Sequence, residues 1–124
     1  MAKASMFLVW GGVFGFLGIV IGAFGAHGIK SRVTPELLVI FETGVKYQMY
    51  HALALIAIGV LLQRVQIPML ATSGWLMIVG TLIFSGSLYV LVLTGVRTWG
   101  AVTPIGGLCF LGGWFLFIIS FLKK

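Results

Sequence analysis

Residues 4–29 read ASMFLVWGGVFGFLGIVIGAFGAHGI and contain no formally charged side chain. The hydrocarbon core of a bilayer is about 30 Å thick, and an α-helix crosses it with roughly 20 apolar residues. We therefore expect a first membrane span at residues 6–26. A secretory signal peptide is the alternative, because Lys3 precedes the apolar run and small residues close it. The uncharged length exceeds that of a usual signal core, so we interpret the segment as a retained helix.

A second helix is predicted to begin at Thr34-Pro35-Glu36. Thr is a good N-cap, Pro suits the first turn, and an acid is favoured where the helix dipole is positive. The helix could run to about Gln63, which is longer than one crossing requires. Its first half is amphipathic, with Glu36, Glu42 and Lys46 in one sector. We expect this half, residues 35–49, to lie in or near the membrane interface and residues 47–63 to enter the bilayer.

Two more spans are expected in the second half of the chain. Residues 65–96 again carry no formal charge, and Pro68 marks the start of a span at residues 68–94. Thr103-Pro104 repeats the N-cap and first-turn pattern, which predicts a fourth span at residues 103–122. Lys123 and Lys124 follow it and can extend toward the headgroups.

The composition leads to the same fold class. Of the 124 residues, 60% are hydrophobic and 8% are charged, whereas a soluble domain carries about 25% charged residues. So few charges could not cover a water-soluble globule. The sequence predicts an all-α integral membrane protein, with residues 1–124 forming one four-transmembrane-helix bundle and an amphipathic interfacial extension at the start of the second helix.

The net charge of +6 arises from eight Lys and Arg against two Glu. These cations stand singly or in pairs between apolar runs, which is typical of membrane proteins whose cations meet anionic headgroups. Nucleic-acid binding would require a basic polar face with interleaved aromatics, so membrane lipids are the expected partners and nucleic acid is not. Four cations fall on each side of the predicted membrane, and the positive-inside rule therefore gives no orientation. Cys109 is the only cysteine, and we expect no metal or other cofactor.

Glycines form a stripe along the first predicted helix. The stripe consists of Gly11, Gly15, Gly18, Gly22 and Gly25, at alternating steps of four and three. Helices in lipid associate by close packing, and small residues let their backbones approach. Weaker lines of small residues run along the third helix (Gly74, Thr81, Ser85) and the fourth (Gly106, Cys109, Gly113, Ser120). Either the stripe packs the four helices of one chain together, or it faces a second copy in a homo-oligomer.

A resemblance to a known family is carried by four runs: GAFGAHG at 22–28, FETGVKYQMYHALA at 41–54, SGSLY at 85–89 and TPIGG at 103–107. Together they resemble the YwdK/YgdD family of small bacterial inner-membrane proteins, which is defined by the domain of unknown function numbered 423. The resemblance covers essentially the whole chain, and the run at 41–54 is specific to this family. It implies a multi-pass protein of the bacterial plasma (inner) membrane, and it implies no settled activity.

The candidate polar or ligand site comprises His27, Glu42, Lys46, Gln48 and His51. Glu42 and Lys46 have the i,i+4 spacing of an ordinary surface ion pair. Gln48 and His51 project into the apolar sector, where unpaired polar groups are unfavourable. Either they bond neighbouring backbone or hydroxyl groups and fix the packing, or they join His27 and Glu42 in a pocket that moves protons or holds a headgroup phosphate. A zinc site would need three or more ligands in proper geometry, which two His and a Glu from separate segments indicate only weakly.

No hydrolase or nucleotide-binding motif occurs in the sequence: Gly-x-Ser-x-Gly, HExxH and a phosphate-binding glycine loop with its lysine are all missing. We therefore predict no catalytic residues and a non-enzymatic membrane component that interacts with lipid or with another membrane protein. The alternative is an oligomeric small transporter or channel that uses Glu42, Lys46 and His51 along a polar path. A membrane enzyme acting on a lipid headgroup would need Glu42 and a histidine within hydrogen-bonding reach.

Overall fold

The computed structural model describes residues 2–122, and all its regular elements are helical. In chain order they are α1 (Ala2–Phe24), the π-helical turn η1 (Gly25–Ile29), α2 (Pro35–Leu62), α3 (Pro68–Thr94), the 3-10 turn η2 (Arg97–Ala101) and α4 (Thr103–Leu122). Four helical stretches are long and apolar enough to cross a membrane. The protein is therefore an all-α integral membrane protein with four transmembrane helices. Lys123 and Lys124 lie outside the described residues.

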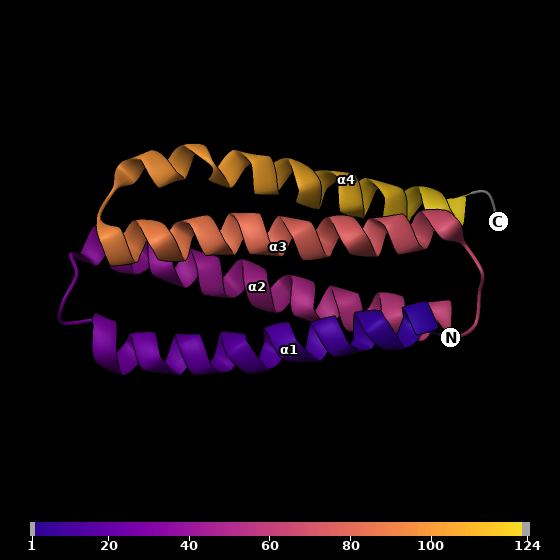
Figure 1. Ribbon diagram of the computed structural model, residues 1–124, viewed down its shortest axis with the longest axis horizontal. Helices are drawn as coiled ribbons and strands as arrows, with labels where there is room; N and C mark the ends of the chain where they lie inside the picture. The colour runs from indigo at the N-terminus through magenta and orange to yellow at the C-terminus, as the bar shows by residue number, and fades with distance from the viewer. Residues whose placement is uncertain (1, 123–124) are drawn as a thin grey trace.

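The helices run up and down, and each packs mainly against its neighbour in sequence (Figure 1). α2 packs between α1 and α3, and α4 lies on the far side of α3. Within residues 2–122, α1 and α4 make no extensive contact with each other. α1 approaches α3 through Phe7, whose ring meets Trp75 edge-on at 5.7 Å between centroids. The bundle is thus open, with α1 and α4 as its outer members.

The predicted and observed helix bounds differ most in the first half of the chain. α3 and α4 cover the ranges expected from Pro68 and from Thr103. The first helix is longer than expected, because it begins at Ala2 and continues through the π turn to Ile29. α2 is one continuous helix, and Phe41 and Gly44 in its amphipathic first half are buried inside the bundle. The extension therefore continues the same helix without a break.

Capping explains where α2 begins and where α3 ends. The Thr34 side chain accepts a hydrogen bond from the Leu37 amide at 3.2 Å, which confirms it as the N-cap of α2. Gly95 ends α3 in the left-handed conformation, at φ 72°, a region that favours glycine. The equivalent N-cap expectation for Thr103 is wrong. Thr103 is the first residue of α4, and its hydroxyl lies 2.6 Å from the Ser87 hydroxyl of α3.

The glycine stripe of α1 faces α2 of the same chain. A Cβ added at Gly11 would lie 2.8 Å from the carbonyl oxygen of Ala52, and one added at Gly18 would lie 2.5 Å from the sulfur of Met49. A Cβ at Gly25 would overlap the ring of Phe41. The stripe therefore packs two helices of one chain together, as the first of our two interpretations expected.

The small residues of α4 serve the same purpose against α3. A Cβ added at Gly106 would lie 2.5 Å from the backbone nitrogen of Phe84, and one added at Gly113 would lie 3.2 Å from the carbonyl oxygen of Ser73. Backbone atoms cannot move aside as a flexible side chain can. The α3–α4 hairpin therefore depends on the missing side chains at Gly106 and Gly113.

Large apolar side chains cover the outer faces of α1 and α4. The most exposed of them include Phe16 and Ile19 on α1, and Leu108, Leu111 and Phe115 on α4. In water such continuous apolar surfaces would drive aggregation. In a bilayer they meet acyl chains, which is the surrounding that the composition requires.

We predict that Gly106→Ala destabilises the protein, because the new methyl group meets the backbone of Phe84. Overpacking of this kind costs about 1–3 kcal/mol. Gly107→Ala is the matched control, since nothing lies within 4 Å of a Cβ at that position. It should leave stability unchanged or raise it slightly, because alanine favours helix. Thermal unfolding in detergent micelles measures both variants, and equal melting temperatures would contradict the close packing of α3 on α4.

Candidate functional site

Gln48 joins three helices in the middle of the bundle. Its side chain is only 4% exposed. The amide nitrogen donates to the carbonyl oxygen of Phe14 on α1 at 2.8 Å, and the amide oxygen accepts from the hydroxyl of Tyr89 on α3 at 2.7 Å. Both ends of the amide are therefore paired inside the apolar interior, where an unpaired end would be unfavourable. Gln48 projects into the bundle as predicted, and its bonds are those of a packing residue.

His51 lies one turn further along α2 and is 3% exposed. The Trp114 indole nitrogen, which can only donate, gives a hydrogen bond to Nε2 of His51 at 3.0 Å. Nε2 is therefore the acceptor, and Nδ1 carries the proton and donates to the carbonyl oxygen of Tyr47 at 2.7 Å. The ring stacks on Phe110 with centroids 3.6 Å apart. Both nitrogens of the neutral imidazole are occupied, which leaves neither for a ligand or a substrate.

Three buried or half-buried hydroxyl groups also hold helices together. Ser85 donates to the carbonyl oxygen of Gly44 at 2.6 Å, which joins α3 to α2. Ser73 donates to the carbonyl oxygen of Gly113 at 2.6 Å, which joins α3 to α4, and Ser87 meets Thr103. Among residues 2–122, no buried side-chain nitrogen or oxygen lacks a partner. The polar interior is therefore a set of satisfied contacts between helices.

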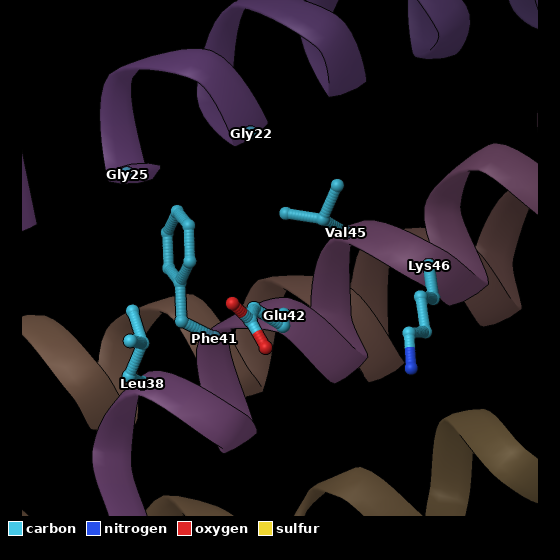
Figure 2. A pocket seen from close by; sticks show the side chains of 7 residues that line it. All are labelled: Gly22, Gly25, Leu38, Phe41, Glu42, Val45 and Lys46. Carbon is cyan, nitrogen blue, oxygen red and sulfur yellow. The ribbon is translucent and has the colours of Figure 1, made fainter. Parts of the chain in front are cut away.

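Glu42 and Lys46 are exposed side chains on the first half of α2. They line a groove of about 270 Å³ between α1 and α2, with Gly22 and Gly25 on the opposite wall (Figure 2). Figure 2 shows the Lys46 amino group directed away from the Glu42 carboxylate. In the described part of the chain the one salt bridge joins Arg97 to Glu36 at 2.8 Å. The ion pair expected between Glu42 and Lys46 is therefore not formed.

The five candidate residues do not converge on one pocket. His27 is exposed in the π turn at the end of α1, whereas Gln48 and His51 are buried and use separate partners. None of the five bonds to another within residues 2–122. The same region holds no group of three or more His, Cys, Asp or Glu that could bind a metal ion. Of the two interpretations of Gln48 and His51, the contacts agree with packing between helices, and the alternative of a pocket shared with His27 and Glu42 is not formed.

The sequence analysis missed the partners that give Gln48 and His51 their roles. Tyr89 belongs to the SGSLY run, but nothing in the sequence assigns its hydroxyl to Gln48. Trp114 offered a clearer indication. Tryptophan in membrane proteins is enriched at the interfaces, so one near the middle of a predicted span indicates a buried partner for its N–H. Neither pairing follows from spacing, because the partners lie 41 and 63 residues apart in sequence.

We predict that Tyr89→Phe lowers the free energy of unfolding, because the amide oxygen of Gln48 loses its donor. Hydrogen bonds between membrane helices contribute about 0.6 kcal/mol on average and up to about 1.7 kcal/mol. Tyr50→Phe is the matched control, since Tyr50 is 56% exposed and its hydroxyl makes no hydrogen bond within the described residues. Unfolding in mixed micelles, followed by circular dichroism, measures the difference. A loss of stability in Tyr50→Phe as large as that in Tyr89→Phe would contradict the structural role of Gln48.

The sequence of this chain is similar to a protein-family model and to known membrane proteins. The model of a protein family of unknown function, DUF423, matches residues 21–107. A UPF0382 membrane protein of Staphylococcus haemolyticus is 44% identical over 96% of this chain and 97% of its own length. The UPF0382 membrane protein YwdK of Bacillus subtilis is 39% identical over 96% of this chain and 98% of its own length. No solved structure matches. The chain therefore belongs to the DUF423 family of membrane proteins, as the four sequence runs indicated.

Proposed function

We propose that the protein is a non-enzymatic component of the bacterial plasma (inner) membrane that acts by binding anionic lipid. The observation that carries this proposal is the division of its polar side chains into two sets. The buried polar side chains make hydrogen bonds that hold the bundle together. The charged set lies exposed, mostly at the ends of the helices. Within residues 2–122, no buried polar side chain is left without a partner for chemistry inside the bundle, whereas exposed charged side chains are available for binding at its surface.

The charges at the helix ends favour anionic lipid over other partners. Lys30 and Arg32 are exposed in the connection between α1 and α2, and Arg64 is exposed at the opposite end of α2. Basic residues beside a membrane surface are each worth about 1 kcal/mol of attraction to anionic lipids. The helical spans also support the inner membrane, because outer membranes are crossed by β-barrels.

We predict that the purified protein enriches phosphatidylglycerol over phosphatidylcholine when it is extracted from vesicles containing both lipids. Glu42→Gln should keep this enrichment within about twofold, because Glu42 is not one of the cations that attract the lipid. Mass spectrometry of the co-purified lipids measures the ratio. The proposal fails if the wild-type protein shows no preference, or if Glu42→Gln abolishes it.

A second candidate function is an oligomeric small transporter or channel. The observation that favours it is the exposure of Glu42 and Lys46 along α2, in the groove beside Gly22 and Gly25. Lys46 is eleven residues from Pro35, about 16 Å along the helix. A charge at such depth is unfavourable against lipid unless a partner or water covers it. A second copy packed on this face would bury both charges in a shared polar path.

The two candidates differ in their expected ion flux. If the second candidate holds, sealed vesicles containing the protein will show proton or cation flux, and Glu42→Gln and Lys46→Gln will each abolish it. The exposed charge of Arg64 lies at the far end of α2, so Arg64→Gln is the control that should leave the flux unchanged. If flux remains at the level of protein-free vesicles, the transporter candidate is wrong.

A further inference from the structure

An apolar cavity opens between α1 and α3 at the end of the bundle that carries η1. At the other end the two helices meet, because Phe7 packs against Gly74 and Trp75. Toward η1 they are separated by a cavity of about 330 Å³. Its lining includes Val20, Phe24, Phe41, Tyr89 and Leu93. The hydroxyl of Tyr89 is already bonded to Gln48, so the cavity presents hydrocarbon and aromatic surface.

A larger and more polar cavity adjoins it at the helix ends. This second cavity measures about 640 Å³ and shares Phe24, Ile29 and Leu93 with the first, so the two adjoin, and we call them together the groove. Its lining adds Arg32 and Thr34. Both volumes fall in the range of about 300–1,000 Å³ that is typical of small-molecule sites.

Arg32 is the group at this mouth that remains free to bind. The Thr34 side chain caps α2, and the Thr94 hydroxyl, which also lines the mouth, donates to the carbonyl oxygen of Val90. The Arg32 side chain is exposed and makes no hydrogen bond or ion pair with any residue between 2 and 122, because its one hydrogen bond comes from the backbone amide to the carbonyl oxygen of Ile29. A guanidinium with free donors binds the oxygens of a phosphate with two parallel hydrogen bonds.

We propose that this groove binds one molecule of an anionic glycerophospholipid, with its phosphate on Arg32 and part of an acyl chain between α1 and α3. The inference rests on the proposed function and gives it a defined site. The polar and apolar parts of the groove are arranged like those of the lipid. Arg32 lies at the helix ends, where headgroups are, and the apolar part extends from there toward the middle of the bilayer. A soluble anion would leave the apolar part empty, and a peptide would find no backbone partners there.

The test uses the full-length protein in bilayer nanodiscs of phosphatidylcholine with a minor fraction of phosphatidylglycerol. Native mass spectrometry counts the lipids that stay bound after release. We expect one phosphatidylglycerol to be retained by the wild-type protein. Arg32→Gln should lower the retained fraction about tenfold, as for a lost charge-assisted bond. Lys30→Gln, which removes an exposed cation outside the groove lining, should change it less than about twofold.

A second pair of variants tests the apolar part. Val20→Trp should fill the space between α1 and α3 and abolish retention, whereas Ile19→Trp, on the outer face of α1, should not. Both variants should unfold at the wild-type temperature, because neither position is buried. Glycerol phosphate added in solution should not displace the retained lipid, because it lacks the acyl chain.

The site is wrong if Arg32→Gln behaves like Lys30→Gln, if Val20→Trp behaves like Ile19→Trp, or if glycerol phosphate competes. The outcomes also separate this site from the general function. Enrichment of phosphatidylglycerol around the wild-type protein without any single retained molecule overturns the site and leaves the proposed function standing. No preference for phosphatidylglycerol at all overturns both.

Discussion

Gln48 supplies the contact on which the arrangement of the first three helices depends. One amide, buried at 4% exposure, donates to the backbone of α1 and accepts from Tyr89 of α3, while its own helix lies between them. Lipid surrounds helices with material as apolar as their own side chains, so water exclusion does not bring them together. Close packing and hydrogen bonds must do so. The amide provides the bonds, and the glycines of α1 allow the approach that brings Phe14 within reach.

The need for close packing between helices also explains why α1 and α4 lie on the outside of the bundle, without extensive contact between them. The glycine stripe of α1 packs against α2, and Gly106 and Gly113 of α4 pack against α3. Each outer helix therefore uses these glycines for close packing against one neighbour. Their remaining faces carry large apolar side chains. α1 and α3 meet at Phe7 and separate toward η1, and the groove that ends at Arg32 lies in that separation.

The buried polar side chains of this protein therefore serve to pack its helices, and the side chains without such contacts are exposed. His51 is the clearest case. A histidine inside a span is by default a functional hypothesis, yet here Trp114 and the backbone of Tyr47 occupy both ring nitrogens. Arg32 is the opposite case, an unremarkable loop cation in the sequence that lines the mouth of the largest cavity described.

The amino-acid sequence by itself determined the four spans, the starts of α2, α3 and α4, the stripe of α1 and the inward direction of Gln48 and His51, because hydrophobic length, capping and helical periodicity are local properties. Only the tertiary structure decided that the stripe faces α2 and that Thr103 bonds Ser87 instead of capping α4. It also decided that Tyr89 and Trp114 are the partners of Gln48 and His51, and that Arg32 lies at a groove. Each of these depends on which helices meet and at what height. Residues far apart in sequence are brought together by packing, which spacing along one helix does not encode.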